Sequence, residues 1–395
     1  MPDRLDQVGT VIDRLSRWTI ETQTWGYVST GTRFKVFHTP GTPRDVWEKI
    51  DDAALVHRLT GVAPTVALHI PWDRVDDYAA LAQHAIERGL RIGSISPNLF
   101  QDDDYRLGSF THTDRAVRAK AVSQVLECVS IMRTVGSKQL SLWFADGTNY
   151  PGQGDFRRRR ARLRDGLQEV YADLDDDMVL LLEYKLFEPA FYHTDLADWG
   201  QSLTMCQQLG PRARVLVDLG HHALGVNIEH IVATLLDEQR LGGFDLNSKK
   251  YADDDLFVGA INPQEVFLIA LELVAGETDP DPAVAATARE VLYKIDQCAM
   301  VEDKIPAMIR SVTAMQTAFA KALLVDRDAL GATRESGDVV GANEVLNDAY
   351  QTDVRPLLRQ VRARLGVPAD PLAAYRESGE DKQRAADRVG IPAGW

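Results

Sequence analysis

Short apolar runs recur every few dozen residues along this chain. Longer stretches separate them, and in these stretches apolar residues recur every three or four positions. The short runs predict buried β-strands, and the longer stretches predict amphipathic helices. Eight runs are candidate strands: 18–24, 66–70, 91–96, 139–144, 178–184, 215–219, 243–246 and 291–295. Six stretches are candidate helices: 78–88, 114–135, 159–174, 196–209, 228–237 and 263–273. This alternation predicts an α/β fold, and eight strands predict a closed (β/α)8 TIM barrel.

Beyond residue 296 the pattern has no strand signal. It predicts helix over 301–330 and 341–365, followed by a tail punctuated by proline and glycine that ends at Trp395. We therefore expect a catalytic barrel domain over residues 1–300 and a C-terminal helical extension over 301–395. Helices added to a complete barrel must cover their apolar stripe on the barrel's outside or on a second subunit. The extension therefore also predicts a homo-oligomer, a dimer or a tetramer.

Composition narrows the range of partners. The 395 residues exceed the roughly 250 of a bare barrel, and the formal net charge of −14 disfavours nucleic acid and acidic membranes as ligands. Three widely spaced cysteines predict neither disulfides nor a thiolate zinc site. No run reaches the length of a membrane span, and the N-terminus lacks the apolar segment of a signal peptide. These features predict a cytoplasmic enzyme that acts on a small molecule, and the arginine run 157–160 is interpreted as the solvated start of a helix.

Acidic residues stand where the last four candidate strands end. Glu183, Asp218, Asp245 and Asp296 each follow or close an apolar run. In a parallel barrel these ends meet at one mouth, where four carboxylates would repel one another unless a cation neutralised them. Hard oxygen ligands favour Mg²⁺ or Mn²⁺ over zinc. The sequence therefore predicts a divalent metal site.

A second cluster is available from His221 and the Asp253-x-Asp255 pair, which predicts a second ion beside the first. Each part also has a plainer interpretation. The aspartates at 253–255, like those at 102–104 and 175–177, can be helix caps or solvated loops. His69 can be a satisfied core histidine, and Glu183 with Lys185 can be an ion pair on one face of a strand. Four successive strands ending in carboxylates favour the metal.

The residues also resemble a known family. The segment Glu183-Tyr-Lys-Leu-Phe-Glu-Pro189, the Asp218-x-x-His221 spacing, the Asp253-x-Asp255 pair and Asp296 resemble the xylose-isomerase-like barrel enzymes. Within that superfamily, segments 69–73, 143–152, 250–256 and 295–297 are similar to bacterial L-rhamnose isomerases. The resemblance covers residues 15–330. It departs at Asp245, where rhamnose isomerases usually carry histidine and where this chain is more like xylose isomerase.

The resemblance implies an aldose–ketose isomerase that interconverts L-rhamnose and L-rhamnulose with two divalent cations, Mn²⁺ first and Mg²⁺ or Co²⁺ as alternatives. By resemblance, Lys185 would neutralise charge on O1, His69 would assist ring opening, and Asp255 would act with the second ion. Trp25, Trp72 and Trp143 offer apolar walls for a sugar, beside His69 and Lys185. Three alternatives stay open: an isomerase for another aldose or ketose, a metal-dependent phosphodiesterase, and a non-catalytic sugar-binding barrel. The choice between hydride shift and enediol also stays open.

Overall fold

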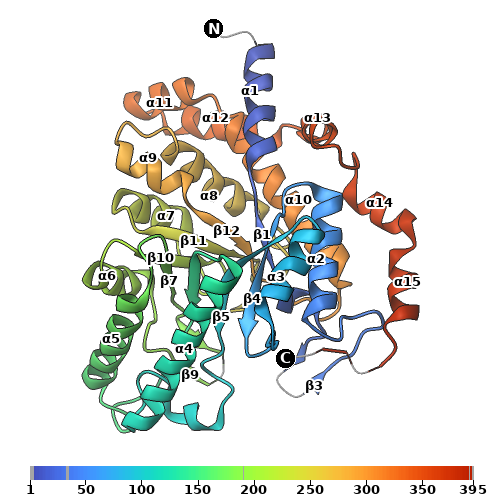
Figure 1. Cartoon of the computed structure of the whole chain (residues 1–395). Helices are drawn as coiled ribbons and strands as arrows, with labels where there is room; N and C mark the ends of the chain where they lie inside the picture. Colours follow the sequence, from blue (N-terminus) through green and yellow to red (C-terminus); the bar gives the residue numbers. More distant parts are fainter. Residues whose placement is uncertain (1–3, 33–34, 190, 391, 394–395) are drawn as a thin grey trace.

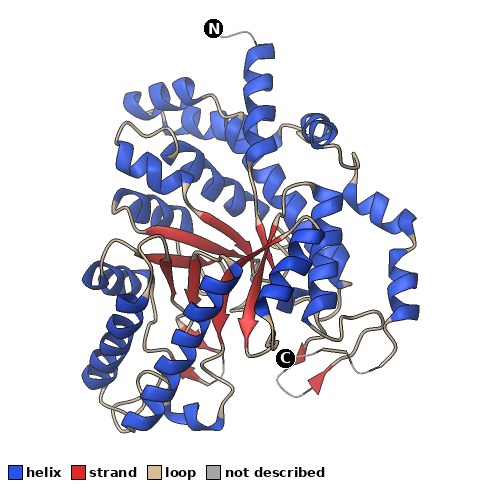
Figure 2. Cartoon of the chain, in the orientation of Figure 1, coloured by secondary structure: helices blue, strands red, loops and turns tan. Residues whose placement is uncertain are grey.

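Eight parallel strands form a closed barrel at the centre of the molecule (Figures 1 and 2). This computed structural model describes residues 4–32, 35–189, 191–390 and 392–393. Around the barrel the strands are β1 (Glu21–Gln23), β4 (Thr65–Ile70), β5 (Arg91–Pro97), β6 (Gln139–Leu142), β7 (Val179–Glu183), β10 (Ala213–Asp218), β11 (Leu241–Leu246) and β12 (Leu292–Ile295), which pairs back with β1. All eight candidate strands are present, so the predicted (β/α)8 barrel is confirmed.

A ring of helices covers the barrel. It comprises α2 (Val46–Thr60), α3 (Tyr78–Glu87), α4 (Arg115–Val135), α5 (Phe156–Asp173), α6 (Trp199–Leu209), α7 (Ile228–Asp237), α8 (Pro263–Gly276) and α10 (Lys304–Leu323), with the short α9 (Pro282–Arg289) beside α8. The six candidate helices are present, whereas α2 and α9 were missed. Most ring helices begin at an aspartate or asparagine whose side chain accepts a backbone N–H, as Asp114 does from Ala116. Much of the acidic excess therefore caps helices rather than forming sites.

Short elements decorate the end of the barrel where the strands terminate. They are η1 (Thr24–Tyr27), the hairpin of β2 (Gly31–Thr32) and β3 (Lys35–Val36), η2 (Asp103–Leu107), and the hairpin of β8 (Phe187–Glu188) and β9 (Tyr192–His193). Helix α1 (Arg4–Arg17) precedes β1 and contacts α10. All three cysteines are free thiols, as expected. In the described part of the chain no helix is both long and apolar enough to cross a membrane.

The C-terminal extension packs on the barrel of its own chain. Its helices are α11 (Arg327–Ser336), α12 (Val339–Gln351), α13 (Arg355–Leu365), α14 (Pro371–Ser378) and α15 (Glu380–Asp387). α13 contacts α1 and α10, and α14 contacts α2 and α10 (Figure 1). The single helix expected over 341–365 is wrong, because the chain breaks ahead of Pro356, whose ring fits only the first turn of a new helix. Gly394 and Trp395 lie outside the described residues.

The division at residue 300 and the homo-oligomer stay predictions. α10, although beyond residue 300, contacts both α2 and α8 and so completes the helical ring of the barrel. The extension's packing against its own barrel also means that a second subunit is not needed to cover α13 and α14.

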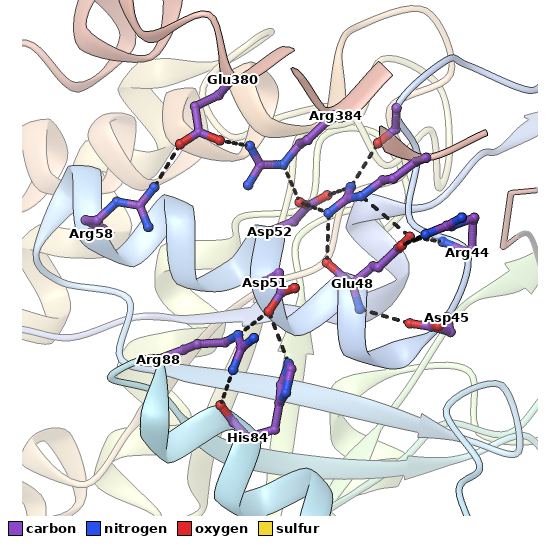
Figure 3. A network of polar contacts seen from close by, with 12 residues as sticks. Arg44, Asp45, Glu48, Asp51, Asp52, Arg58, His84, Arg88, Glu380 and Arg384 are labelled. Atoms are coloured by element: carbon purple, nitrogen blue, oxygen red, sulfur yellow. Dashed lines mark hydrogen bonds and ion pairs between the residues drawn. The ribbon is translucent and has the colours of Figure 1, made fainter. Parts of the chain in front are cut away.

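One carboxylate joins the end of the extension to the barrel. Asp52 of α2, buried at 2% exposure, accepts hydrogen bonds from Arg384 Nε at 2.8 Å and from Arg388 Nη2 at 2.7 Å. Arg388 also donates to the carbonyl of Gly41 at 2.8 Å, in the loop that leads into α2. Figure 3 shows the neighbouring Asp51 on the same helix pointing the other way, toward Arg88 and His84.

We expect Asp52→Asn to destabilise the protein much more than Asp51→Asn does. The first change removes a buried carboxylate that two largely buried guanidinium groups share, which costs about 3 kcal/mol. Among the described residues, Arg384 then keeps only Glu380 as an acidic partner, and Arg388 keeps only Glu48. The second removes a partly exposed pair worth less than about 1 kcal/mol. Chemical denaturation of both variants measures the difference. Equal, small losses of unfolding free energy would show that the extension is not anchored through Asp52.

Candidate functional site

A cavity of about 390 Å³ opens where the barrel strands end. This volume lies within the range typical of small-molecule sites. Of the predicted site residues, all but Asp218 line it, namely Trp25, His69, Trp72, Trp143, Glu183, Lys185, His221, Asp245, Asp253, Asp255 and Asp296. The structure therefore brings the residues chosen from the sequence to one place.

The carboxylates at the strand ends form a compact cluster. Ligand atoms of Asp218, Asp245 and Asp296 lie within 4.8 Å of one another, as do those of Glu183, Asp218 and His221. Glu183 closes β7, Asp218 closes β10 and stands in register with Asp245 of β11, and Asp296 follows β12 directly. Asp218 belongs to both groups and is almost completely buried, so it lies at the centre of the cluster.

Neighbouring donors fix the orientation of these carboxylates. Asn247 Nδ2 lies 3.0 and 3.1 Å from the two oxygens of Asp218, and the backbone N–H of Gly220 donates to Asp218 at 2.6 Å. Trp25 Nε1 donates to Asp296 at 2.7 Å. Donors that orient carboxylates in this way are typical of the surroundings of metal ligands.

Ionising all the carboxylates of the cluster is unfavourable, because they are buried and close together. Burial raises the pKa of Asp218 to about 7, and the nearby Glu183 carboxylate adds to the effect. Burial likewise raises the pKa of Asp245 and Asp296 above the usual range. Asp245 Oδ1 is buried and makes no hydrogen bond within the described residues. A set of hard oxygen donors with one imidazole fits a divalent cation such as Mn²⁺ or Mg²⁺.

His221 connects the cluster to the loop after β11. Its Nδ1 lies 3.1 Å from Glu183 Oε1, and its Nε2 lies 2.8 Å from Asp253 Oδ1. Burial alone would lower the pKa of His221, but Asp218 and Asp253 together raise it. The predicted second cluster is thus only partly assembled, because His221 groups with Glu183 and Asp218, whereas Asp253 and Asp255 belong to neither group.

The Asp253-x-Asp255 pair is not an ordinary solvated loop. Both residues have left-handed backbone conformations, with φ of 54° at Asp253 and 47° at Asp255, which a non-glycine residue rarely adopts. Both line the cavity. Burial raises the pKa of Asp255 well above its usual range, whereas His221 and Lys185 outweigh burial at Asp253 and lower its pKa. By contrast, Asp102–Asp104 and Asp175–Asp177 are exposed, as expected.

Lys185 carries a fixed positive charge at the edge of the cavity. Its Nζ lies 2.5 Å from Asp253 Oδ2 and 2.8 Å from Glu188 Oε2, and 4.9 Å from the centre of the Trp143 ring. Burial would lower the pKa of Lys185, but the two carboxylates raise it above its usual value. The side chain is therefore an ammonium group at neutral pH.

His69, in contrast, is neutral. Burial lowers its pKa to about 3, helped by the positive charge of Lys294. The imidazole stacks on Trp72 with 4.0 Å between ring centres and meets Trp25 edge-on at 5.3 Å. Its Nδ1 has no hydrogen-bond partner in the described part of the chain, so the interpretation of His69 as a satisfied core histidine is wrong.

Sequence reasoning missed several residues that shape the site. Lys294 lines the cavity and lies 3.1 Å from Asp245. Asp73 accepts hydrogen bonds from Thr24 and from the backbone N–H of His69, and pairs with Lys49 at 2.7 Å. A signal existed for Lys294, since a lysine inside the last apolar run is unusual. The arginine run 157–160 starts α5 as expected, except that Arg159 is buried and pairs with Asp195.

Comparison with known proteins shows relatives of the whole chain. A probable sugar isomerase of Rhizobium meliloti strain 1021 is 42% identical over 99% of this chain and 92% of its own length. A probable sugar isomerase of Mesorhizobium japonicum is 41% identical with the same coverage. Among solved structures, an L-ribulose 3-epimerase superposes with a TM-score of 0.55 over 82% of this chain and 98% of that one, at 13% identity, which is a likeness of fold alone.

The family follows from the match of a family model. Residues 59–270, more than half of the chain, match the model of the xylose isomerase-like TIM barrel. The matched segment holds six of the barrel strands and, with them, the side chains of Glu183, Asp218 and Asp245. By this match, and by its relatives along its whole length, the chain belongs to the xylose isomerase-like TIM barrel family.

Proposed function

We propose that this protein is a metal-dependent aldose–ketose isomerase, with L-rhamnose and L-rhamnulose as the first substrate pair to test. The observation that carries the proposal is the meeting of a carboxylate cluster with a buried ammonium group in one cavity of sugar-binding size. Relatives named probable sugar isomerase support it.

The cluster offers ligands for two cations. Glu183, Asp218, Asp245 and Asp296 would hold the first, and His221, Asp253 and Asp255 the second. Bound there, a divalent cation supplies a Lewis acid for adjacent substrate oxygens. The side chains of the protein supply the rest of the chemistry.

Lys185 stabilises negative charge on the substrate. Moving hydrogen between C1 and C2 places negative charge on O1, and an ammonium group held in advance by Asp253 and Glu188 meets that charge without reorganisation. Because the pKa of Lys185 is raised, it acts as a cation and not as a base.

His69 suits proton acceptance during ring opening. Because burial lowers its pKa, His69 is a neutral imidazole, and its Nδ1, which has no hydrogen-bond partner among the described residues, is free to accept the proton of the C1 hydroxyl. Ring opening also needs an acid that delivers a proton to the ring oxygen as its bond to C1 breaks, and we assign this role to Asp255, whose pKa is raised by burial and by the nearby Asp253 carboxylate. In this scheme His69 is the base and Asp255 the acid.

The aromatic side of the cavity suits a deoxy sugar. Trp72 and Phe100 have ring centres 6.0 Å apart, and Phe100 lies 4.9 Å from Trp143. L-rhamnose carries a methyl group at C6, and an apolar wall accepts a methyl group at a lower desolvation cost than a hydroxyl group. This feature favours L-rhamnose over a fully hydroxylated aldose.

A substrate panel tests the function. Protein stripped of metal and re-supplied with Mn²⁺ should convert L-rhamnose to L-rhamnulose faster than it converts L-mannose, D-allose or D-xylose, and chelation should abolish turnover. Ketose substrates analysed for 3-epimers form a separate arm. Turnover by a verified metal-free preparation, or 3-epimers as the sole products, would contradict the proposal.

Removing Lys185 should slow the chemical step. Lys185→Met is expected to lower kcat by roughly 10²-fold or more, as for loss of one preorganised charge, with metal content unchanged. Lys138→Met, an exposed lysine paired with Asp177, is the control and should keep kcat. A normal kcat in the Lys185 variant would assign this residue a structural role.

Metal should change how stability depends on pH. An unfolded aspartate titrates near about 4, whereas Asp218 in the folded protein titrates at about 7. The folded state therefore binds this proton more tightly, and stability falls as pH rises between these values. A bound cation removes this penalty, so the Tm gain from Mn²⁺ should grow from pH 5 to pH 8. Parallel Tm curves with and without Mn²⁺ would mean that no cation binds at Asp218.

A further inference from the structure

Lys294 stands in the barrel interior between two acidic neighbours. It belongs to β12, and its partners in register are Asp245 on β11 and Glu21 on β1, the strands on either side (Figure 1). Side chains in register on neighbouring parallel strands share a face of the sheet. Lys294 is 1% exposed and Glu21 is 2% exposed, so an ammonium group is enclosed by the barrel.

The contacts of Lys294 commit it to Asp245. Its Nζ lies 3.1 Å from Asp245 Oδ1, 3.4 Å from Ser141 Oγ across the barrel, and 5.4 Å from the centre of the Trp25 ring. Glu21 is occupied elsewhere, because both its oxygens accept hydrogen bonds from the backbone N–H of Ser94. Asp245 is thus the carboxylate that receives most of this positive charge.

We propose that Lys294 is the built-in counter-ion of the metal centre: it neutralises Asp245 and orients it, so that the pair ligates a cation without adding net charge. The proposal rests on the metal site of the proposed function. Of the four carboxylates in the cluster, Lys294 neutralises the charge of Asp245, so the metal has three negative charges left to neutralise. The Asp245–Lys294 pair therefore supplies a carboxylate oxygen to the metal but, like a neutral ligand, adds no net charge.

The geometry leaves Asp245 able to ligate. The ion pair joins Lys294 Nζ to Asp245 Oδ1 at 3.1 Å. The other carboxylate oxygen, Oδ2, takes no part in this contact and can ligate a cation. A carboxylate held on one side by an ion pair presents a single oxygen, which suits the octahedral preference of Mg²⁺ and Mn²⁺.

A double-mutant cycle on Mn²⁺ affinity, measured by calorimetry without sugar, tests the proposal. Lys294→Met should bind Mn²⁺ at least roughly tenfold more tightly, since a cation no longer repels the metal, and Asp245→Asn should bind at least roughly tenfold more weakly. The double variant should return to within about threefold of the parent, because the neutral amide replaces the neutral pair. Lys294→Met is prepared with Mn²⁺ present, since its metal-free form carries four unbalanced carboxylates.

Lys49→Met is the matched control. Lys49 is a buried lysine paired with Asp73 at 2.7 Å, away from the cluster, so its loss should lower stability without moving Mn²⁺ affinity by more than about threefold. A Lys294→Met protein with unchanged or weaker Mn²⁺ affinity, or a double variant that binds Mn²⁺ as weakly as Asp245→Asn does, overturns the proposal. No Mn²⁺ binding by the parent overturns both proposals. If the variants show the expected Mn²⁺ affinities but the protein isomerises none of the sugars, only the proposed function is contradicted.

Discussion

The repulsion among the carboxylates at the barrel mouth is the constraint around which the site is organised. Asp218 sits in both ligand groups, and burial deprives it of the water that would stabilise its charge. The polar contacts to the cluster reduce this repulsion. Asn247 and Trp25 donate hydrogen bonds to it, His221 bridges Glu183 and Asp253, and Lys294 pairs with Asp245. A cation that bound here would relieve this repulsion.

The barrel strands position the carboxylates of the site, and the loops that follow the strands are held by hydrogen bonds of their own. Asp146, in the loop after β6, is buried and accepts hydrogen bonds from both the backbone and the hydroxyl of Ser109 and of Thr111. Arg159 joins the same region to Asp195 and to the carbonyl of Leu107. These buried bonds connect loops from three successive strands. Trp143 lies in the same loop as Asp146, beside these bonds, and Lys185 Nζ lies 4.9 Å from the centre of its ring.

The sequence predicted what depends on local pattern. A buried strand that ends in a polar residue is a local signal, so Glu183, Asp218 and Asp296 were found and lie together in the structure. Lys294 was missed because a lysine inside an apolar run, although unusual, points to a role in the site only once Asp245 is known to lie beside it. The anchoring of α15 through Asp52 and Arg388 joins residues 336 positions apart, which no periodicity reveals. The break before Pro356 was readable from the chain but was overridden by the helical pattern around it.

Charge balance bears on the number of cations. Seven carboxylates surround the cavity and its cluster, those of Glu183, Glu188, Asp218, Asp245, Asp253, Asp255 and Asp296, and two ammonium groups, Lys185 and Lys294, face them. Five negative charges then remain. One divalent cation would leave three of them in a poorly solvated site, whereas two would leave one, which protonation of a single side chain removes. Uncompensated charge of this kind is costly away from water. This balance supports the proposal of two cations, and the pairing of Lys294 with Asp245 lowers by one the negative charge that they would have to neutralise.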